Sequence, residues 1–341
     1  MKTGNEITIH DIARELKISA STVSRALNNN PRISKATKEK IREAALKMGY
    51  RPNSIASQLR TKKTNTIGVV IPRISRHFFS SAISGIEDVA YRNGYSVIIT
   101  QSEEDYEREK LNVQSLFSNR VDGIIVSLAM GSENFDHFKL FTDKKIPLVF
   151  FDRYCQEIST PQVLIDDFEG GYQATKHLIE QGCRNIVHIG GPQKLNIYAN
   201  RLKGYQQALE DARIRFKESN FYVSDLTRKA GERIVEEIFA AEEKPDAIFC
   251  ANDTSALSII QYAKANGIRI PEDLCIIGFS NEPYSELLTP SLSTVAQPGF
   301  EMGQTAAEMV IKQITEKTIE DTKIIMPTQL IIRESTLKKQ Q

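Results

Sequence analysis

Short apolar segments alternate with amphipathic helical segments over residues 66–317, and this alternation constrains the fold more than any other feature of the chain. Continuous Val/Ile-rich segments joined by helices are typical of parallel sheets that helices cover on both faces. Nearly two sets of about five strand–helix units predict an α/β core of two doubly wound parallel-sheet subdomains. The predicted strands are 66–72, 95–100, 122–128, 147–152, 162–166, 185–191, 246–252, 274–280 and 293–297, and the predicted helices include 78–92, 105–119, 169–181, 202–213, 254–266 and 300–317.

Polar residues close several of these strands. They are Asp152, Asn252 with Asp253, Ser280 with Asn281, and Gln297. Ligands of open α/β sheets bind at the carboxyl ends of the strands, so these residues predict a ligand cleft. Asp152 and Asn252 could instead cap the turns that follow them, but their strand-end position favours a ligand role.

Residues 7–60 carry a different pattern, typical of a small helical DNA-binding module. Two segments place apolar residues at the i, i+3, i+4, i+7 spacing of one helix face, namely Ile9, Ile12, Ala13 and Leu16, then Ile41, Ala44, Ala45 and Met48. The segment between them turns Val23, Ala26 and Leu27 inward and leaves small hydroxylated residues and Arg25 outward. Such a surface suits a recognition helix in a DNA major groove. A three-helix bundle with a merely polar face is the alternative.

Charge favours the DNA-binding interpretation. Residues 1–64 contain 14 Lys/Arg and 5 Asp/Glu, whereas the remaining residues contain 30 Lys/Arg and 38 Asp/Glu, so the whole-chain net charge of +1 conceals a basic head and an acidic body. A basic head attracts the phosphate backbone, and an acidic body discourages the rest of the molecule from sticking to DNA.

Boundary residues of this module are also recognisable. Thr8 with Asp11 resembles a capping box, Ser19 and Ser34 are predicted N-caps, and Gly49 is predicted to end the third helix. Lys17 occupies a turn position where glycine is common, at a cost of under ~1 kcal/mol if the backbone there is left-handed.

A short helical segment follows Pro52, with Ile55, Ala56 and Leu59 on one face. It is shorter than the roughly 12–15 residues at which isolated helices become marginal, so we expect it to order only against a symmetry mate and DNA. Leu59 would then be a wedge between base steps in the minor groove, with Arg60 beside it. Leu59 could instead pack on the core, but the polar linker TKKTNT that follows favours the wedge.

Other classes of protein find little support. The N-terminus shows no apolar signal segment, and the apolar runs are too short to span a bilayer, so we expect a cytoplasmic protein. The cysteines at 155, 183, 250 and 275 are expected to be reduced and buried. We find neither a metal-ligand spacing among the five histidines nor a phosphate-loop or catalytic motif, and therefore predict no metal, no cofactor and no enzymatic activity.

The chain resembles transcriptional regulators of the lactose/galactose repressor (LacI/GalR) family over essentially its whole length. The matching motifs are TIHDIARELKISASTVSRALN from Thr8, Tyr50-x-Pro52-Asn53 with Ala56 and Leu59, FFDR at 150–153, DDFEGG at 166–171, RLKGY at 201–205, AND at 251–253 and IPEDLCIIGF at 270–279. The resemblance implies a core like a periplasmic binding protein, a small effector between its subdomains, and a homodimer or tetramer. The C-terminal TLKKQQ is too short for a tetramerising helix, which favours the dimer.

The resemblance also implies roles for individual residues of the DNA-binding module. Arg25 matches the base-reading arginine, Ala20 and Ser21 match the positions that vary operator choice, and Leu59 matches the intercalating leucine. Phosphate-contacting or positioning roles fall to Ser24, Asn28, Ser34, Thr37 and Tyr50. The remaining members of the predicted DNA-binding set are Thr8, Ser19, Thr22, Asn53, Ala56 and Arg60.

In the core, Asp152, Arg201, Asn252 and Gln297 match polar effector-site positions, and Phe78 and Phe79 lie where aromatic residues line the ligand. One of the two phenylalanines could instead belong to the core, and Arg201 could pair with a nearby acid at the start of its helix rather than anchor the effector. Ser280 stands where the family usually has Asp; serine carries no charge, so selectivity would be altered or Glu282 would help. The apolar Leu195 and Ile197 weaken a nucleobase site relative to a sugar site.

Together these features predict a DNA-binding domain at 1–51, a hinge at 52–65 and an effector-binding core at 66–341. The core would comprise an N-subdomain (66–165 and 296–326) and a C-subdomain (166–295 and 327–341). The predicted function is a transcriptional regulator, with repressor favoured over activator, that binds a palindromic double-stranded operator under control of a sugar or sugar derivative. A transport solute-binding protein would need an export signal and no basic head. A sugar- or nucleotide-acting enzyme would need a catalytic constellation.

Overall fold

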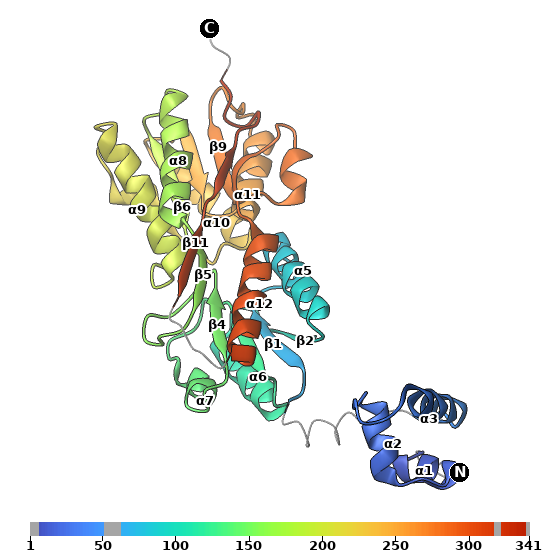
Figure 1. Cartoon of the computed structure of the whole chain (residues 1–341). Helices are drawn as coiled ribbons and strands as arrows, with labels where there is room; N and C mark the ends of the chain where they lie inside the picture. Colours follow the sequence, from blue (N-terminus) through green and yellow to red (C-terminus); the bar gives the residue numbers. More distant parts are fainter. Residues whose placement is uncertain (1–6, 51–62, 317–321, 339–341) are drawn as a thin grey trace, which may run out of the picture. The chain divides into compact units, whose positions relative to one another are not determined.

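The computed structural model describes residues 7–50, 63–316 and 322–338. The chain divides into two compact units, Met1–Lys63 and Thr64–Gln341 (Figure 1). The second unit therefore begins two residues before the predicted core, because Thr64 is held by that unit: its amide donates to Asp122 Oδ1 at 3.0 Å and its hydroxyl to the Arg120 carbonyl at 2.8 Å. The predicted hinge residues Asn53, Ala56, Leu59 and Arg60 lie outside the described residues, so their roles stay predictions.

The first unit is a three-helix module with α1 at Ile9–Leu16, α2 at Ala20–Leu27 and α3 at Lys35–Lys47. Apolar side chains from all three helices form its core, among them Ile12, Val23, Ala26, Ile41 and Ala45. The order of helices and the one-sided apolar spacing are those that the sequence predicts.

The predicted helix boundaries of this module are confirmed. The Asp11 carboxylate accepts bonds from Thr8 N at 2.9 Å and Thr8 Oγ1 at 2.7 Å. Ser19 Oγ accepts from Thr22 N at 3.1 Å, and Ser34 Oγ accepts from Thr37 N at 3.3 Å. Gly49 follows α3 with φ +71°, and Lys17 adopts the left-handed conformation with φ 54°. The turn between α1 and α2 is thus made without glycine, at a small conformational cost.

The second unit contains two six-stranded sheets. Strand order is β11-β5-β4-β3-β1-β2 in the first sheet and β12-β10-β9-β8-β6-β7 in the second, and all neighbours are parallel except β10 and β12. The strands of the first sheet are β1 Thr66–Ile71, β2 Ser96–Gln101, β3 Gly123–Val126, β4 Leu148–Phe151, β5 Gln162–Ile165 and β11 Lys323–Met326. Those of the second are β6 Ile186–Gly190, β7 Phe221–Val223, β8 Ala247–Cys250, β9 Cys275–Ser280, β10 Ser293–Ala296 and β12 Gln329–Ile331.

Helices accompany the strands in the order expected of a doubly wound fold. They are α5 His77–Arg92, α6 Tyr106–Ser118, α7 Lys139–Thr142, α8 Asp167–Glu180, α9 Asn196–Asp211, α10 Arg228–Ala240, α11 Asp253–Ala265 and α12 Gly299–Glu316, with 3₁₀ turns η1 Asp136–Phe138, η2 Glu218–Asn220 and η3 Pro283–Glu286. The predicted fold of a helix-turn-helix domain plus two doubly wound subdomains is confirmed. In Figure 1 the two sheets with their helices form two lobes of the core unit.

Some details differ from the predictions. The helix predicted at 202–213 is α9, which starts six residues earlier at Asn196; its N-cap Leu195 makes no side-chain capping bond, so the sequence carries no start signal there. Strands β7, β11 and β12 were not predicted, because runs of three or four residues are too short to show a period. The four cysteines are buried and free, as expected.

Each lobe contains one pair of helices in close contact through glycines. In the first lobe, a Cβ on Gly85 of α5 would lie 2.0 Å from the Phe300 carbonyl oxygen, and a Cβ on Gly303 of α12 would lie 2.0 Å from that of Ala82. In the second lobe, a Cβ on Gly171 of α8 would lie 2.4 Å from the Arg201 carbonyl oxygen, and a Cβ on Gly204 of α9 would lie 2.1 Å from that of Phe168. Backbone-to-backbone packing leaves little room for either pair to slide.

Gly303→Ala is expected to destabilise the core unit by roughly 1–3 kcal/mol, because the added methyl group meets a backbone oxygen that cannot rotate away. Urea unfolding followed by circular dichroism measures the effect. Ser84→Ala is the matched control, since Ser84 is an exposed residue of α5 whose hydroxyl donates only within its own helix. Equal midpoints for the glycine variant and wild type would contradict the close-packing account.

Candidate functional site

A cleft with a cavity volume of about 70 Å³ lies at the carboxyl ends of the strands of both sheets. All seven residues predicted to bind the effector line it: Phe78, Phe79, Asp152, Arg201, Asn252, Ser280 and Gln297. Charged neighbours that the prediction did not include, such as Glu104, Arg153 and Arg76, occupy much of the remaining wall. The structure thus brings the predicted set together, although these residues come from six separate parts of the sequence.

Asp152 follows β4 and stands in the left-handed region with φ 63°. Its side chain is buried and accepts a long bond of 3.3 Å from the Ser127 hydroxyl, while Arg153 Nε lies 3.7 Å from the same Oδ2. Burial raises the pKa of this carboxyl, against the lowering effect of the Arg153 and Arg201 charges. A buried, weakly bonded carboxylate at a strand end has acceptor capacity left for a ligand.

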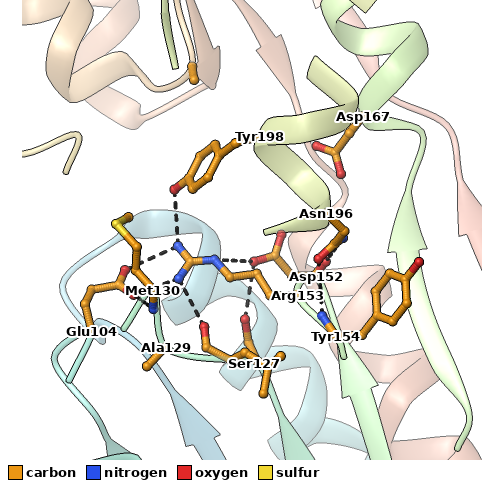
Figure 2. Close-up of polar contacts among 12 residues, drawn as sticks. Glu104, Ser127, Ala129, Met130, Asp152, Arg153, Tyr154, Asp167, Asn196 and Tyr198 are labelled. Atoms are coloured by element: carbon orange, nitrogen blue, oxygen red, sulfur yellow. Dashed lines mark hydrogen bonds and ion pairs between the residues drawn. The ribbon is translucent and has the colours of Figure 1, made fainter. Parts of the chain in front are cut away.

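Arg153 spans the cleft beside it (Figure 2). Its Nη1 donates to Glu104 Oε2 at 2.7 Å and to the Leu128 carbonyl at 3.1 Å, and its Nη2 donates to Glu104 Oε1 at 3.2 Å and to the Tyr198 hydroxyl at 3.4 Å. Because Tyr198 belongs to α9 of the other lobe, this side chain fills the cleft and connects its two walls. The FFDR motif contains this arginine, but only its neighbour Asp152 was predicted to bind.

Glu104 holds both this arginine and the loop after β3. It accepts the Met130 amide at 2.7 Å in addition to the two bonds from Arg153. Burial works to raise the pKa of Glu104, but the charge and hydrogen bonds of Arg153 outweigh it and bring the pKa below its ordinary value. Glu104 is therefore an ionised partner of Arg153.

Arg201 was predicted to anchor the effector, with pairing to a nearby acid as the alternative. The structure shows a pairing: Nε and Nη2 both lie 2.8 Å from Asp167 Oδ1, at the start of α8 rather than of α9. Nη1 donates to the Ala251 carbonyl at 2.8 Å, and the guanidinium stacks 3.6 Å from the centre of the Phe279 ring. Burial raises the pKa of Asp167 to about 7 against the opposing effect of Arg201. All three guanidinium nitrogens are thus engaged by the protein.

Asn252 shows the capping role that was weighed against ligand binding. Its Oδ1 accepts Ser255 N at 2.9 Å at the start of α11, and its Nδ2 donates to the Leu226 carbonyl at 3.0 Å. The amide can still offer one proton and one lone pair to the cleft, so an effector contact stays a prediction.

Asp253, the next residue, fixes the loop after β9. Its carboxylate accepts bonds from Glu282 N at 2.8 Å, Ser285 Oγ at 2.8 Å and Thr294 Oγ1 at 2.7 Å. Burial raises the pKa of Asp253 to about 6, although these bonds oppose the shift. This buried side chain therefore helps to hold the 280–285 segment in the cleft wall, together with Thr294 and Arg333, which bond to Asn281.

That segment turns sharply. Ser280 and Asn281 both have positive φ, 111° and 52°, a conformation that costs non-glycine residues of order 1–3 kcal/mol each. The turn directs Glu282 toward the first lobe, where its Oε1 accepts the His77 amide at 3.3 Å. Functional sites are where such strain is commonly found.

Phe78 and Phe79 lie at the start of α5 and are both buried. Their rings meet edge to face at 5.1 Å, and both contact Phe151, with ring centres 6.5 and 6.2 Å away. They are therefore part of the core of the first lobe as well as part of the cleft wall.

Several hydrogen bonds connect the lobes around the cleft. Arg76, at the N-terminus of α5, donates to the Thr254 hydroxyl and, at 3.2 Å, to the Leu226 carbonyl. On the other side, Asn196 Nδ2 donates to the Asp152 carbonyl at 3.0 Å and its Oδ1 accepts Tyr154 N at 3.3 Å (Figure 2). Any change in the angle between the lobes must break or lengthen these bonds.

The predicted DNA-reading residues of the first unit form one polar surface around α2. Arg25, Ser21 and Asn28 are exposed, whereas Ala20, Thr22 and Ser24 are half-buried. Ser19, Ser21 and Thr22 share a hydroxyl cluster with oxygens 2.8 Å apart. Tyr50 packs on the core of the module, and Thr8, Ser34 and Thr37 stand at the starts of α1 and α3.

Comparison with known proteins agrees with both halves of this description. Residues 8–53 match the model of bacterial regulatory proteins of the lacI family, and residues 175–336 match the periplasmic binding protein-like domain. Catabolite control protein A of Priestia megaterium is 34% identical over 331 residues, which cover 97% of this chain and 99% of that protein.

The chain belongs to the lacI family of bacterial regulatory proteins. The ribose operon repressor of Halalkalibacterium halodurans is also 34% identical, over 330 residues that cover 96% of this chain and 97% of that protein. A solved complex of the transcriptional regulator CelR with cellobiose has a TM-score of 0.73 and 28% identity and covers 97% of this chain and 100% of that one. Membership of this family makes the protein a DNA-binding transcriptional regulator and not an enzyme. Among the described residues, no helix has the length and apolarity to cross a membrane.

Glu104→Gln is expected to lower the free energy of unfolding at neutral pH by about 3–5 kcal/mol, because the buried Arg153 loses its hydrogen-bonded counter-charge and keeps only the Asp152 carboxylate, 3.7 Å away. The pKa of Glu104 lies below its ordinary 4.5 in the folded protein, so its ionised form stabilises the fold above about pH 4.5. That contribution is lost as the pH falls through the lowered folded-state pKa.

Urea unfolding of wild type and variant between pH 7 and pH 3 measures both effects. The difference between their free energies of unfolding should become smaller toward pH 3. Glu107→Gln is the control, since Glu107 forms an exposed ion pair with Lys110 that contributes little. A difference in the free energy of unfolding that does not change with pH would show that Glu104 is not the ionised partner of Arg153.

Proposed function

We propose that this protein is a homodimeric repressor of the cytoplasm that binds a palindromic double-stranded operator and changes its operator affinity when a carbohydrate occupies the cleft. The observation that carries the proposal is the cleft itself, in which polar side chains from both lobes of the core meet at the carboxyl ends of the strands. A ligand that contacts both walls favours one arrangement of the lobes over others, which is the requirement for allosteric control.

The chemistry of the cleft supports a carbohydrate. Carboxylates, amides and hydroxyls surround a small space bounded by the rings of Phe78, Phe79 and Tyr198, a mixture suited to hydroxyl groups and to the apolar face of a sugar ring. Two relatives point the same way, since one is a ribose operon repressor and another was solved with cellobiose.

Under this proposal residues 1–51 read the operator. Arg25 would bond a base edge, and Ser24, Asn28, Ser34, Thr37 and Tyr50 would contact or position phosphates. Residues 52–65 would form the hinge, with Leu59 as the minor-groove wedge. The core 66–341 would bind the effector through an N-subdomain of 66–165 with 296–326 and a C-subdomain of 166–295 with 327–341.

Exposed apolar side chains support the homodimer. Edge strand β2 exposes Ile98 and Ile99, and edge strand β7 exposes Val223; Leu111 of α6 and Tyr91 of α5 are 62% and 77% exposed. Unpaired strand edges that carry exposed apolar side chains can pair with another chain, and exposed apolar patches mark interaction sites. A second copy of the chain would cover them and would match the two halves of a palindromic operator.

Effector and operator affinities are expected to be linked reciprocally. A thermal-shift screen of mono- and oligosaccharides, nucleobases and phosphosugars identifies a ligand, and its dissociation constant is then measured with and without a palindromic operator. The factor by which operator changes ligand affinity must equal the factor by which ligand changes operator affinity. A ligand that binds the cleft yet leaves operator affinity unchanged would contradict the proposed control.

Arg25→Ala is expected to weaken operator binding by ~1–3 kcal/mol and to relax specificity at one base pair of each half-site. Binding of wild type and variant to single-base operator variants, at one fixed salt concentration, measures this. Arg14→Ala is the control, because Arg14 is an exposed arginine of α1 paired with Asp11 rather than a residue of α2. If every base change in the operator weakens binding of Arg25→Ala by the same factor as it weakens binding of wild type, Arg25 does not read a base.

A further inference from the structure

Arginines and carboxylates of the cleft differ in how much bonding capacity they have left. Arg153 is committed to Glu104, the Leu128 carbonyl and Tyr198, and Arg201 is committed to Asp167 and the Ala251 carbonyl. Arg76 donates to Thr254 and to the Leu226 carbonyl. These three of the four arginines that line the cleft therefore use most of their donors within the protein.

Two carboxylates are bonded much more weakly. Over residues 7–50, 63–316 and 322–338, the hydroxyl of Ser127, at 3.3 Å, is the one hydrogen-bond donor to the Asp152 carboxylate. Within the same residues the Glu282 carboxylate accepts one bond, from the His77 amide, also at 3.3 Å. An ionised carboxylate can accept about four hydrogen bonds, so each retains acceptor capacity toward the cleft.

The charge balance of the lining points in the same direction. Four arginines and five carboxylates face the cleft, and Asp167 adds a sixth acid behind Arg201. Arg73, which has no side-chain partner among the described residues, is half-buried, and its charge acts on Glu104. A ligand carboxylate or phosphate that paired with Arg153 or Arg201 would have to displace Glu104 or Asp167, and one that paired with Arg73 would meet the charge of Glu104.

From these observations, and building on the carbohydrate-effector function proposed above, we propose that Asp152 and Glu282 hold the effector from opposite lobes and that the cleft selects an uncharged or cationic polyol while excluding sugar acids and sugar phosphates. Asp152 belongs to the wall formed after β4, and Glu282 to the wall formed after β9. Hydroxyl and ammonium groups supply the donors that both carboxylates lack.

Glu282 thereby takes the place of the acid expected at position 280. The side chain of Ser280 is short and neutral, but the two positive-φ residues Ser280 and Asn281 turn the chain, and Asp253 fixes the Glu282 amide at 2.8 Å. Glu282 is thus a specificity-determining residue held by a rigid support. Its bond to the His77 amide also joins the lobes, so a ligand that engages this carboxylate acts directly on a connection between them.

The test uses the full-length dimer and matched sugar series. Glucose, galactose and mannose are each offered as the neutral sugar, the 2-amino sugar, the uronate and the 6-phosphate, together with cellobiose and cellobiose 6′-phosphate, and binding is measured by thermal shift and calorimetry. We expect binding by neutral or amino members and none by their acidic counterparts. This comparison needs no variant, so it does not depend on how any mutant folds.

Glu282→Gln is then expected to weaken binding of the best neutral sugar by about tenfold to a hundredfold, the effect of losing a hydrogen bond to a charged group. Glu286→Gln is the matched control, because Glu286 is exposed on η3 and does not line the cleft. The dissociation constant of this variant for the sugar should equal that of wild type.

The outcomes separate this inference from the function on which it rests. Tighter binding of a uronate or phosphate than of its neutral counterpart overturns the inference while leaving the carbohydrate function in place, as does an unchanged affinity in Glu282→Gln. If no sugar of these series and none of the wider screen of mono- and oligosaccharides binds, the carbohydrate function itself is overturned, and the inference with it.

Discussion

The buried ion pair between Arg153 and Glu104 is the interaction on which the cleft depends. Removing two charges from water is costly, and such a pair persists only where further hydrogen bonds satisfy both groups. Here the Leu128 carbonyl, the Met130 amide and the Tyr198 hydroxyl provide them. The pair therefore fixes the loop after β3, fills the space between the lobes and leaves a cavity of about 70 Å³, well below the roughly 300 Å³ typical of small-ligand sites. We therefore expect sugar binding to be accompanied by movement of Arg153 or by separation of the lobes.

The lobes themselves are poorly suited to absorb such a change. Gly85 and Gly303 bring α5 and α12 into backbone contact, and Gly171 and Gly204 do the same for α8 and α9. Close-packed interiors transmit strain instead of deforming continuously. Ligand binding is therefore expected to act on the few bonds that join the lobes, at Arg76, Asn196 and Glu282. This concentrates the effect of a small ligand on the angle between two rigid bodies, a common route of allosteric control.

Much of the architecture was predictable because its signals are local. Val/Ile runs such as 66–72 and 274–280 predicted buried strands, and the serines at 19 and 34 predicted the starts of α2 and α3. Short strands such as β7 and the uncapped start of α9 carry no comparable signal. They depend on partners far away in the sequence, which no local pattern reveals.

The candidate site likewise has features that the sequence predicts and features that depend on distant partners. Strand-end positions predicted that Asp152, Asn252 and Gln297 would line one cleft, because the carboxyl ends of parallel strands meet at one edge. The partners of each side chain were not predictable in the same way. Arg201 is committed to Asp167, 34 residues away, and Arg153 to Glu104, 49 residues away. Which groups are already bonded, and which still need a partner, emerges only from the folded arrangement.

The central claim is that a ligand in the cleft changes the angle between two rigid lobes, and the distance between the lobes tests it most directly. Spin labels on Glu107→Cys in α6 and Glu237→Cys in α10 report this distance by electron–electron double resonance, and the buried native cysteines are poor labelling sites. Labelled protein diluted with unlabelled protein keeps the measurement within one protomer. A cleft-binding sugar is expected to shift the distance distribution over the concentration range in which it alters operator affinity. An unchanged distribution at saturating sugar, with operator affinity altered, would contradict it.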